Sequence, residues 1–156
     1  MARPANGPLV TPTSAPPAPL LVFAQPGDVR VDVDAWSAHA AQFFATRIGL
    51  ANEEHSFVVA PDGHPPGIRT AAARPSTTTD FAAADAAEAR SRGAGLAPLA
   101  RRCKTVWVVA RESPTDALAL RLAVILASVF LGPILDPASG EIFGVKTGRA
   151  KVESLV

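Results

Sequence analysis

The chain has 156 residues, 48% of them hydrophobic and 19% charged, and its formal net charge is +1. This length and composition fit one globular domain and exclude a globally disordered chain. The small net charge argues against a strong chain-wide attraction to nucleic acid or anionic lipid. A single cysteine, Cys103, excludes an internal disulfide framework. It gives no sign of an oxidising compartment, so we expect a cytoplasmic protein.

Residues 1–18 are rich in Pro, Ala, Thr and Ser. We predict a disordered leader there, because such a segment buries too little apolar area to offset the entropy of ordering. The only apolar run near the start is short and follows several prolines, which is not the pattern of a signal peptide. We therefore place a single α+β domain at 19–148 and a short mixed-charge tail at 149–156.

Two strands and a helix are predicted in the first part of the domain. The continuous apolar residues of 19–24 predict a strand buried on both faces, and 55–60 predict a second strand. Between them, Asp34 is the expected N-cap of a helix that Gly49 ends. Residues 29–33 alternate in polarity, and an unpaired edge strand there could support a homodimer.

The segment 61–103 is expected to be inserted between the second and third strands. Its first part, 61–79, is rich in Pro, Gly and Thr and predicts a long irregular loop. Asp80 then begins an Ala-rich helix with high helix propensity but few large side chains. The glycines at 93–95 end that helix, and residues 96–102 predict a further helical turn.

The strongest apolar surface is predicted to lie on a helix between Ser113, the expected N-cap, and Gly132, the expected left-handed cap. Large aliphatic side chains recur there at helical spacing, and Arg121 and Ser128 leave only a narrow polar edge. Such a helix must be covered on most of its surface. The alternative, a membrane span, usually needs about 20 apolar residues, and this run is shorter and contains Arg121.

The order of the elements predicts the fold class. A strand at 104–110 precedes the apolar helix, and a turn at 136–141 joins two short extended segments after it. This order fits an α+β fold, a ferredoxin-like split β-α-β sandwich in which two helices cover one face of the sheet. The inserted segment would cover the other face. A three-layer α/β arrangement is the alternative.

The closing pattern of the chain is an apolar helix ending in Gly, a short strand, the sequence D-P-x-x-G-E and another short strand. It loosely resembles the ends of small bacterial α+β domains, some of them associated with toxin immunity. The resemblance covers only the last third of the chain and brings no defined catalytic residue. It therefore implies a bacterial α+β domain and assigns no family.

No catalytic or nucleotide-binding motif occurs in the sequence, and no catalytic residue, metal site or cofactor is assigned. We therefore favour a non-enzymatic module that acts by protein–protein contact, in an adaptor or immunity-like role, with a protein partner of unknown identity. The loop 61–79 would be its natural contact surface, because loops on a rigid scaffold often carry binding residues.

Two alternative functions use particular residues. A small-ligand-binding protein or enzyme would have its cleft near the loop 61–79, with candidate ligand-binding residues His55, Asp62, His64 and Arg69. Contact with a polyanion would instead use a basic run, although no aromatic residue is interleaved there to stack on bases. The residues of that run are Arg90, Arg92, Arg101, Arg102 and Lys104.

Overall fold

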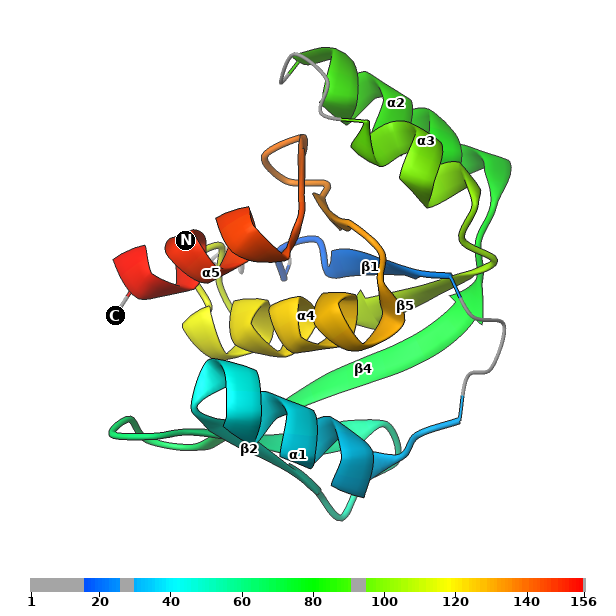
Figure 1. Cartoon of the computed structure of the whole chain (residues 1–156). Coiled ribbons are helices and arrows are strands. Elements are labelled where there is room, and N and C mark those ends of the chain that lie inside the picture. Colours follow the sequence, from blue (N-terminus) through cyan, green and yellow to red (C-terminus); the bar gives the residue numbers. More distant parts are fainter. Residues whose placement is uncertain (1–15, 26–29, 91–94, 156) are drawn as a thin grey trace, which may run out of the picture.

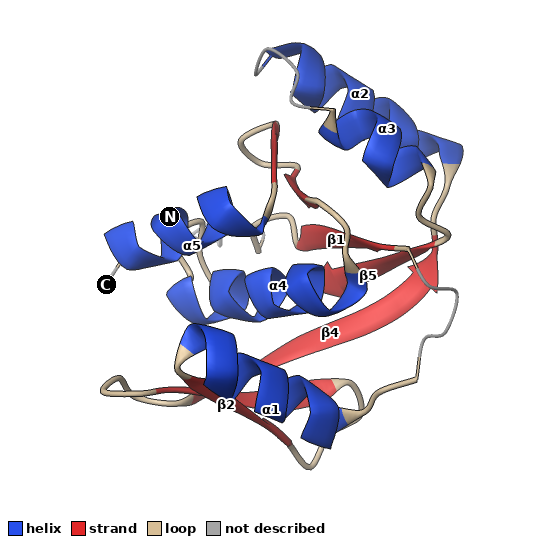
Figure 2. Cartoon of the chain, viewed as in Figure 1, coloured by secondary structure: helices blue, strands red, loops and turns tan. Residues whose placement is uncertain are grey.

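A computed structural model describes residues 16–25, 30–90 and 95–155 of the chain. Its helices and strands are shown in Figures 1 and 2. In chain order they are β1 (Leu20–Ala24), α1 (Val33–Phe44), β2 (Thr46–Leu50), β3 (Ser56–Pro61), β4 (Gly67–Pro75), α2 (Thr78–Arg90), α3 (Leu96–Arg101), β5 (Thr105–Val109), α4 (Ala117–Phe130), β6 (Ile134–Asp136), β7 (Glu141–Phe143) and α5 (Val145–Ser154).

In the described part of the chain, seven strands form one sheet in the order β2-β3-β4-β5-β1-β6-β7. Every neighbouring pair is antiparallel. Strand β4 joins the two parts of the sheet, because its residues 67–70 pair with β3 and its residues 71–75 pair with β5. The predicted α+β class is confirmed.

Strands β5 and β6 each pair antiparallel with β1, so they run parallel to one another with β1 between them. Helix α4 connects them, which makes β5-α4-β6 a split β-α-β unit. The finer prediction of a ferredoxin-like sandwich is not confirmed by this seven-stranded sheet. Strands β2 and β4 were not predicted from the sequence.

Two segments differ from the sequence-based expectation. The prediction of a long irregular loop at 61–79 is wrong. Strand β4 occupies Gly67–Pro75 and pairs with β3 on one side and with β5 on the other. The helix predicted to continue to Gly49 ends at Phe44, where Ala45 adopts a left-handed conformation with φ of 48°, and β2 follows. Residues 30–32 form no strand, and Val29 lies outside the described residues.

Helices cover both faces of the central strands (Figures 1 and 2). Helices α1, α4 and α5 share a buried cluster with Leu20 and Val22 of β1. Helices α2 and α3 share a second buried cluster with Leu21 and Phe23 of the same strand. Since successive residues of a strand point to opposite faces, the two clusters lie on opposite sides of the sheet. The helices of the segment 61–103 therefore cover the second face.

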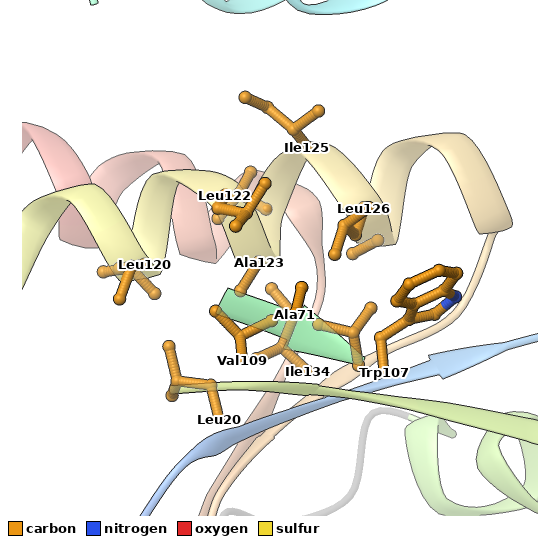
Figure 3. Close-up of a cluster of buried hydrophobic side chains, with 14 of the residues drawn as sticks. Leu20, Ala71, Trp107, Val109, Leu120, Leu122, Ala123, Ile125, Leu126 and Ile134 are labelled. Carbon is orange, nitrogen blue, oxygen red and sulfur yellow. The ribbon is translucent and has the colours of Figure 1, made fainter. Parts of the chain in front are cut away.

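Helix α4 is the centre of the larger cluster. Nine of its fourteen residues are buried. In Figure 3 the side chains of Ala123 and Leu126 extend toward the strand residues, whereas Ile125 points away from them. Ile125 is nevertheless fully buried, so α4 is also covered on its far side, where α1 and α5 pack against it.

An aromatic cluster connects α1 with β5 and with the end of α4. The ring centroids of Trp36 and Trp107 lie 5.4 Å apart in an edge-to-face arrangement. Phe130 stacks on Trp107 at 5.5 Å, and Phe57 of β3 lies 5.4 Å from Trp36. Such pairs stabilise a core beyond the apolar area that they bury.

The ends of the helices are capped by residues other than those predicted. Asp32 caps α1 in place of Asp34, and Asp116 caps α4 in place of Ser113. At the other end of α4, Leu131 takes the left-handed conformation, with φ of 59°. In the described ranges, no helix is long and apolar enough to cross a membrane.

Gly132 is needed for a close approach, and not for the left-handed cap that the sequence suggested. A Cβ atom at this position would meet the carbonyl oxygen of Phe23 at 1.7 Å. Because the obstacle is backbone of the central strand β1, a side chain at position 132 would require the strand or the helix end to move.

We predict that Gly132→Ala destabilises the protein by at least about 2 kcal/mol, the scale of overpacking in a tight core. Chemical denaturation followed by circular dichroism would measure the free energy of unfolding. Gly144→Ala is the matched control, because no atom lies within 4 Å of a Cβ built at Gly144. Equal stabilities of the two variants would contradict the assigned role of Gly132.

Candidate functional site

A cavity of about 450 Å³ lies between the end of α1, the β3–β4 turn, α4 and α5. We call it the α1–α5 pocket. Its walls combine aromatic and aliphatic side chains with five ionisable ones. The lining residues are Ala41, Gln42, Phe43, Phe44, Ala45, Asp62, His64, Arg121, Val124, Arg149, Val152 and Glu153.

Arg121 is the most deeply placed cation of this pocket. Its Nη1 donates to the carbonyl oxygen of Phe44 and to Oγ1 of Thr46, both at 3.1 Å. Its Nε and Nη2 atoms make no hydrogen bond to any described residue. Burial lowers the pKa of Arg121, and the nearby carboxylate of Glu153 opposes that shift. Arg121 therefore lines the cavity as a partly desolvated guanidinium with two donor nitrogens that are unused within the described structure.

Helix α5 and the β3–β4 turn supply the other charged groups. The guanidinium of Arg149 lies over the ring of Phe44, 5.2 Å from its centroid. Glu153 follows one helical turn later. Asp62 and His64 lie on the turn at Gly63, which has φ of 77°. The backbone N–H of Asp62 donates to the carbonyl oxygen of Ala45 at 2.8 Å, which ties the turn to the end of α1.

The side chains of Asp62, His64, Arg149 and Glu153 make no hydrogen bond with any other described residue, and all four are exposed. Arg149 contacts the ring of Phe44, and Glu153 interacts electrostatically with Arg121, but the polar atoms of all four side chains can still form hydrogen bonds with a bound molecule. This availability distinguishes the α1–α5 pocket from a second cavity of the described structure.

This second cavity, of about 510 Å³, lies between the start of α4, the β6–β7 hairpin and the end of α5. Its buried charges are already paired. Arg111 forms a bidentate pair with Asp136 at 2.6 and 3.2 Å. Asp116 accepts two hydrogen bonds from Arg69 of β4 at 2.8 and 3.1 Å.

The two aspartates of these pairs have lowered pKa values for the same reason. Burial raises the pKa of Asp116, but hydrogen bonds from Arg69 and from the backbone N–H groups of Glu112 and Ala119 outweigh burial. For Asp136, hydrogen bonding and charge from Arg111 likewise outweigh burial. These ionised, fully bonded groups hold β4, β6 and α4 together, and they offer a ligand little unused bonding capacity.

Of the four ligand-binding residues proposed from sequence, the structure brings Asp62 and His64 together in one pocket. Arg69 belongs to the ion pair with Asp116, and its side chain is only 13% exposed. His55 lies on the β2–β3 turn beside Glu54 and lines none of the larger pockets.

Sequence analysis missed three residues of the pocket. Arg121 interrupts an apolar helix, and this charged residue among apolar ones was the only sequence signal that could have indicated a binding residue there. Arg149 and Glu153 fall at 149–156, which was expected to be a tail, whereas α5 spans Val145–Ser154 and packs on α4.

Two members of the basic run proposed for polyanion contact already have neighbours in the structure. Arg101 pairs with Asp85 and lies over the ring of Phe81. The guanidinium of Arg90 lies against Gly140 of the β6–β7 turn. Arg102 and Lys104 are exposed. Arg92 lies outside the described residues.

Neither a reactive thiol nor a metal cluster is apparent among the described residues. Burial raises the pKa of the Cys103 thiol to about 11, and Arg102 opposes the shift. The thiol is therefore protonated at neutral pH and behaves as a small core residue. In the ranges 16–25, 30–90 and 95–155, no three His, Cys, Asp or Glu side chains gather as a metal site would require.

The outer face of β2, β3 and β4 is an exposed surface that neither buried cluster includes. Val58 and Ala60 are half-buried there, and Ile68 is 55% exposed. The free edge of β2 is partly blocked, because the backbone N–H of Ile48 donates to the hydroxyl of Ser37 on α1 at 3.0 Å. An incoming strand would therefore have to displace α1.

The fold defines a mixed α+β protein with helices on both faces of an antiparallel sheet. No known protein family matches the chain, and neither a curated protein nor a solved structure matches it. A function for this chain can therefore be inferred only from its own fold and pockets.

We predict that Asp116→Ala destabilises the protein by about 3 kcal/mol at neutral pH. The variant removes the N-cap of α4 and leaves the mostly buried Arg69 with only the exposed carboxylate of Glu112, at 3.4 Å, as an ion-pair partner. The contribution of the pair is present above the ordinary carboxyl pKa of 3.8. It is lost as the pH falls through the lower pKa of the folded state. Denaturation of both proteins from pH 7 to 2 should show the difference in unfolding free energy shrinking in acid.

Asp85→Ala is the control for this measurement. The Asp85–Arg101 pair is about half exposed on both sides, so its loss should cost less than about 1 kcal/mol. A difference between wild type and Asp116→Ala that stays constant down to pH 2 would contradict the assignment.

Proposed function

We propose that this chain is a small-ligand-binding protein and that the α1–α5 pocket receives an anionic group of the ligand. The observation that carries the proposal is the partly buried side chain of Arg121, which lines the cavity and whose Nε and Nη2 make no hydrogen bond to a described residue. Guanidinium groups bind carboxylates and phosphates through two parallel hydrogen bonds, which are about twice as strong as neutral ones.

The size and composition of the pocket support this proposal. Its volume of about 450 Å³ lies in the range of small-molecule sites, which are mostly apolar with a few placed polar groups. Phe43, Phe44, Val124 and Val152 provide the apolar part, and the charged groups converge on one cavity.

We predict that Arg149→Gln weakens the binding of 3-phenylpropionate or inorganic phosphate roughly tenfold, the effect of losing one hydrogen bond to a charged group. Isothermal titration calorimetry on the full chain would measure the dissociation constants. Arg149 is exposed and makes no hydrogen bond to a described residue, so the variant should fold normally.

Arg47→Gln is the matched control, because Arg47 is an exposed arginine on β2 that does not line the pocket. It should leave both dissociation constants unchanged. If neither of these probes nor L-phenylalanine binds to the wild type, or if the two variants bind equally, the proposed function is wrong.

A protein-interaction role is the second candidate, and the outer face of β2–β3–β4 is the observation that favours it. Val58, Ala60 and Ile68 form an apolar surface there, and an apolar surface with a polar surround is typical of interaction sites. The partner is of unknown identity, and the simplest version is a second copy of the chain. Polyanion contact through Arg102 and Lys104 remains a further prediction, to be tested by salt-dependent heparin binding.

For the homodimer version, we predict that the wild type sediments as a dimer and that Ile68→Asp sediments as a monomer, because a buried unpaired carboxylate opposes association. Sedimentation equilibrium over a range of protein concentrations would measure the mass. Leu131→Asp is the control, since Leu131 is 65% exposed at the end of α4, away from this face. A wild type that stays monomeric at all concentrations would contradict this version.

A further inference from the structure

The α1–α5 pocket holds charges of both signs, and this feature narrows the ligand class. Arg121 and Arg149 supply two cations, and Asp62 and Glu153 supply two carboxylates. No side-chain nitrogen of the two arginines lies within 4.0 Å of a carboxylate oxygen of Asp62 or Glu153, although ion pairs of that length occur elsewhere in the described structure. The pocket is therefore close to electrically neutral while each of its charges remains available.

We propose that the ligand is a small zwitterion, an amino carboxylate with an apolar or aromatic body. This inference rests on the proposed function, because it names the ligand of the same pocket. The carboxylate of the ligand accepts hydrogen bonds from Arg121 and Arg149. Its ammonium group donates to Asp62 and Glu153, and its body contacts the apolar wall.

Charge complementarity favours a zwitterion over an ion of a single sign. A phosphate dianion that reached Arg121 would also approach Asp62 and Glu153, and the repulsion would offset part of the attraction. A simple amine would meet the two guanidinium groups in the same way. A molecule with one charge of each sign satisfies both sets, and no charge of the pocket is desolvated without a partner.

The apolar wall sets the character of the ligand's body. Phe43 is 47% exposed although it lies on the wall of the pocket. Val124 and Val152 are almost fully buried and close the bottom of the pocket between α4 and α5. An aromatic or branched aliphatic side chain against Phe43 would remove apolar surface from water at roughly 25 cal/mol per Å².

The test compares three probes that share one body and differ only in charge: L-phenylalanine, 3-phenylpropionate and 2-phenylethylamine. Isothermal titration calorimetry on the full chain should give the tightest binding for phenylalanine, roughly tenfold tighter than for 3-phenylpropionate. The double variant Asp62→Asn/Glu153→Gln should remove this advantage and leave the affinity for 3-phenylpropionate unchanged or higher. Both residues are exposed, so the fold should be retained.

The double variant Glu53→Gln/Glu54→Gln on the β2–β3 turn is the matched control, since it removes two carboxylates outside the pocket. It should keep the preference for phenylalanine. If 3-phenylpropionate binds the wild type as tightly as phenylalanine does, the zwitterion inference is overturned and the proposed function stands. If none of the three probes binds, both are overturned.

Discussion

Helix α4 has to be enclosed on almost every side, because nine of its fourteen residues are buried. One face packs on the sheet, and α1 and α5 cover the rest. The two polar residues on its apolar surface are used to attach α1. Arg121 donates to the carbonyl oxygen of Phe44 at the end of α1, and Ser128 shares a hydrogen bond of 2.7 Å with His39. The narrow polar edge of α4 therefore forms hydrogen bonds with α1 and is not simply a surface that faces solvent.

The pocket is a consequence of the same packing. Helix α5 approaches α4 so closely that a Cβ at Gly148 would meet Cγ2 of Val124 at 2.6 Å. Helix α1 ends at Phe44 and turns into β2, and the pocket lies where the end of α1 meets α4 and α5. Arg121 lines this pocket, and burial and an unused hydrogen-bonding capacity occur together on its side chain. The position of the proposed binding site thus follows from how α4 is covered.

The elements that sequence analysis predicted well have strong local signals. The apolar run of β5, the existence of α4 as a long buried helix and the turn before Glu141 are specified by residues next to one another, although the caps of α4 are Asp116 and Leu131 instead of the predicted residues. Strand β4 has no such signal, since Ile68 is its one large apolar residue and three alanines follow in a row. Its conformation depends on pairing with β3 and β5. In the pocket, Asp62 and His64 were recognisable as polar residues on a turn. Arg149 and Glu153 were not, because only the packing of α5 brings them there.

The aromatic cluster has a consequence for how the protein can be observed. The chain contains two tryptophans and no tyrosine, and both tryptophans lie in the contact between α1 and β5. Intrinsic fluorescence therefore reports on a single joint of the molecule. Separation of α1 from the sheet would change the tryptophan emission directly. Loosening of α2 and α3 on the opposite face would leave the emission nearly unchanged.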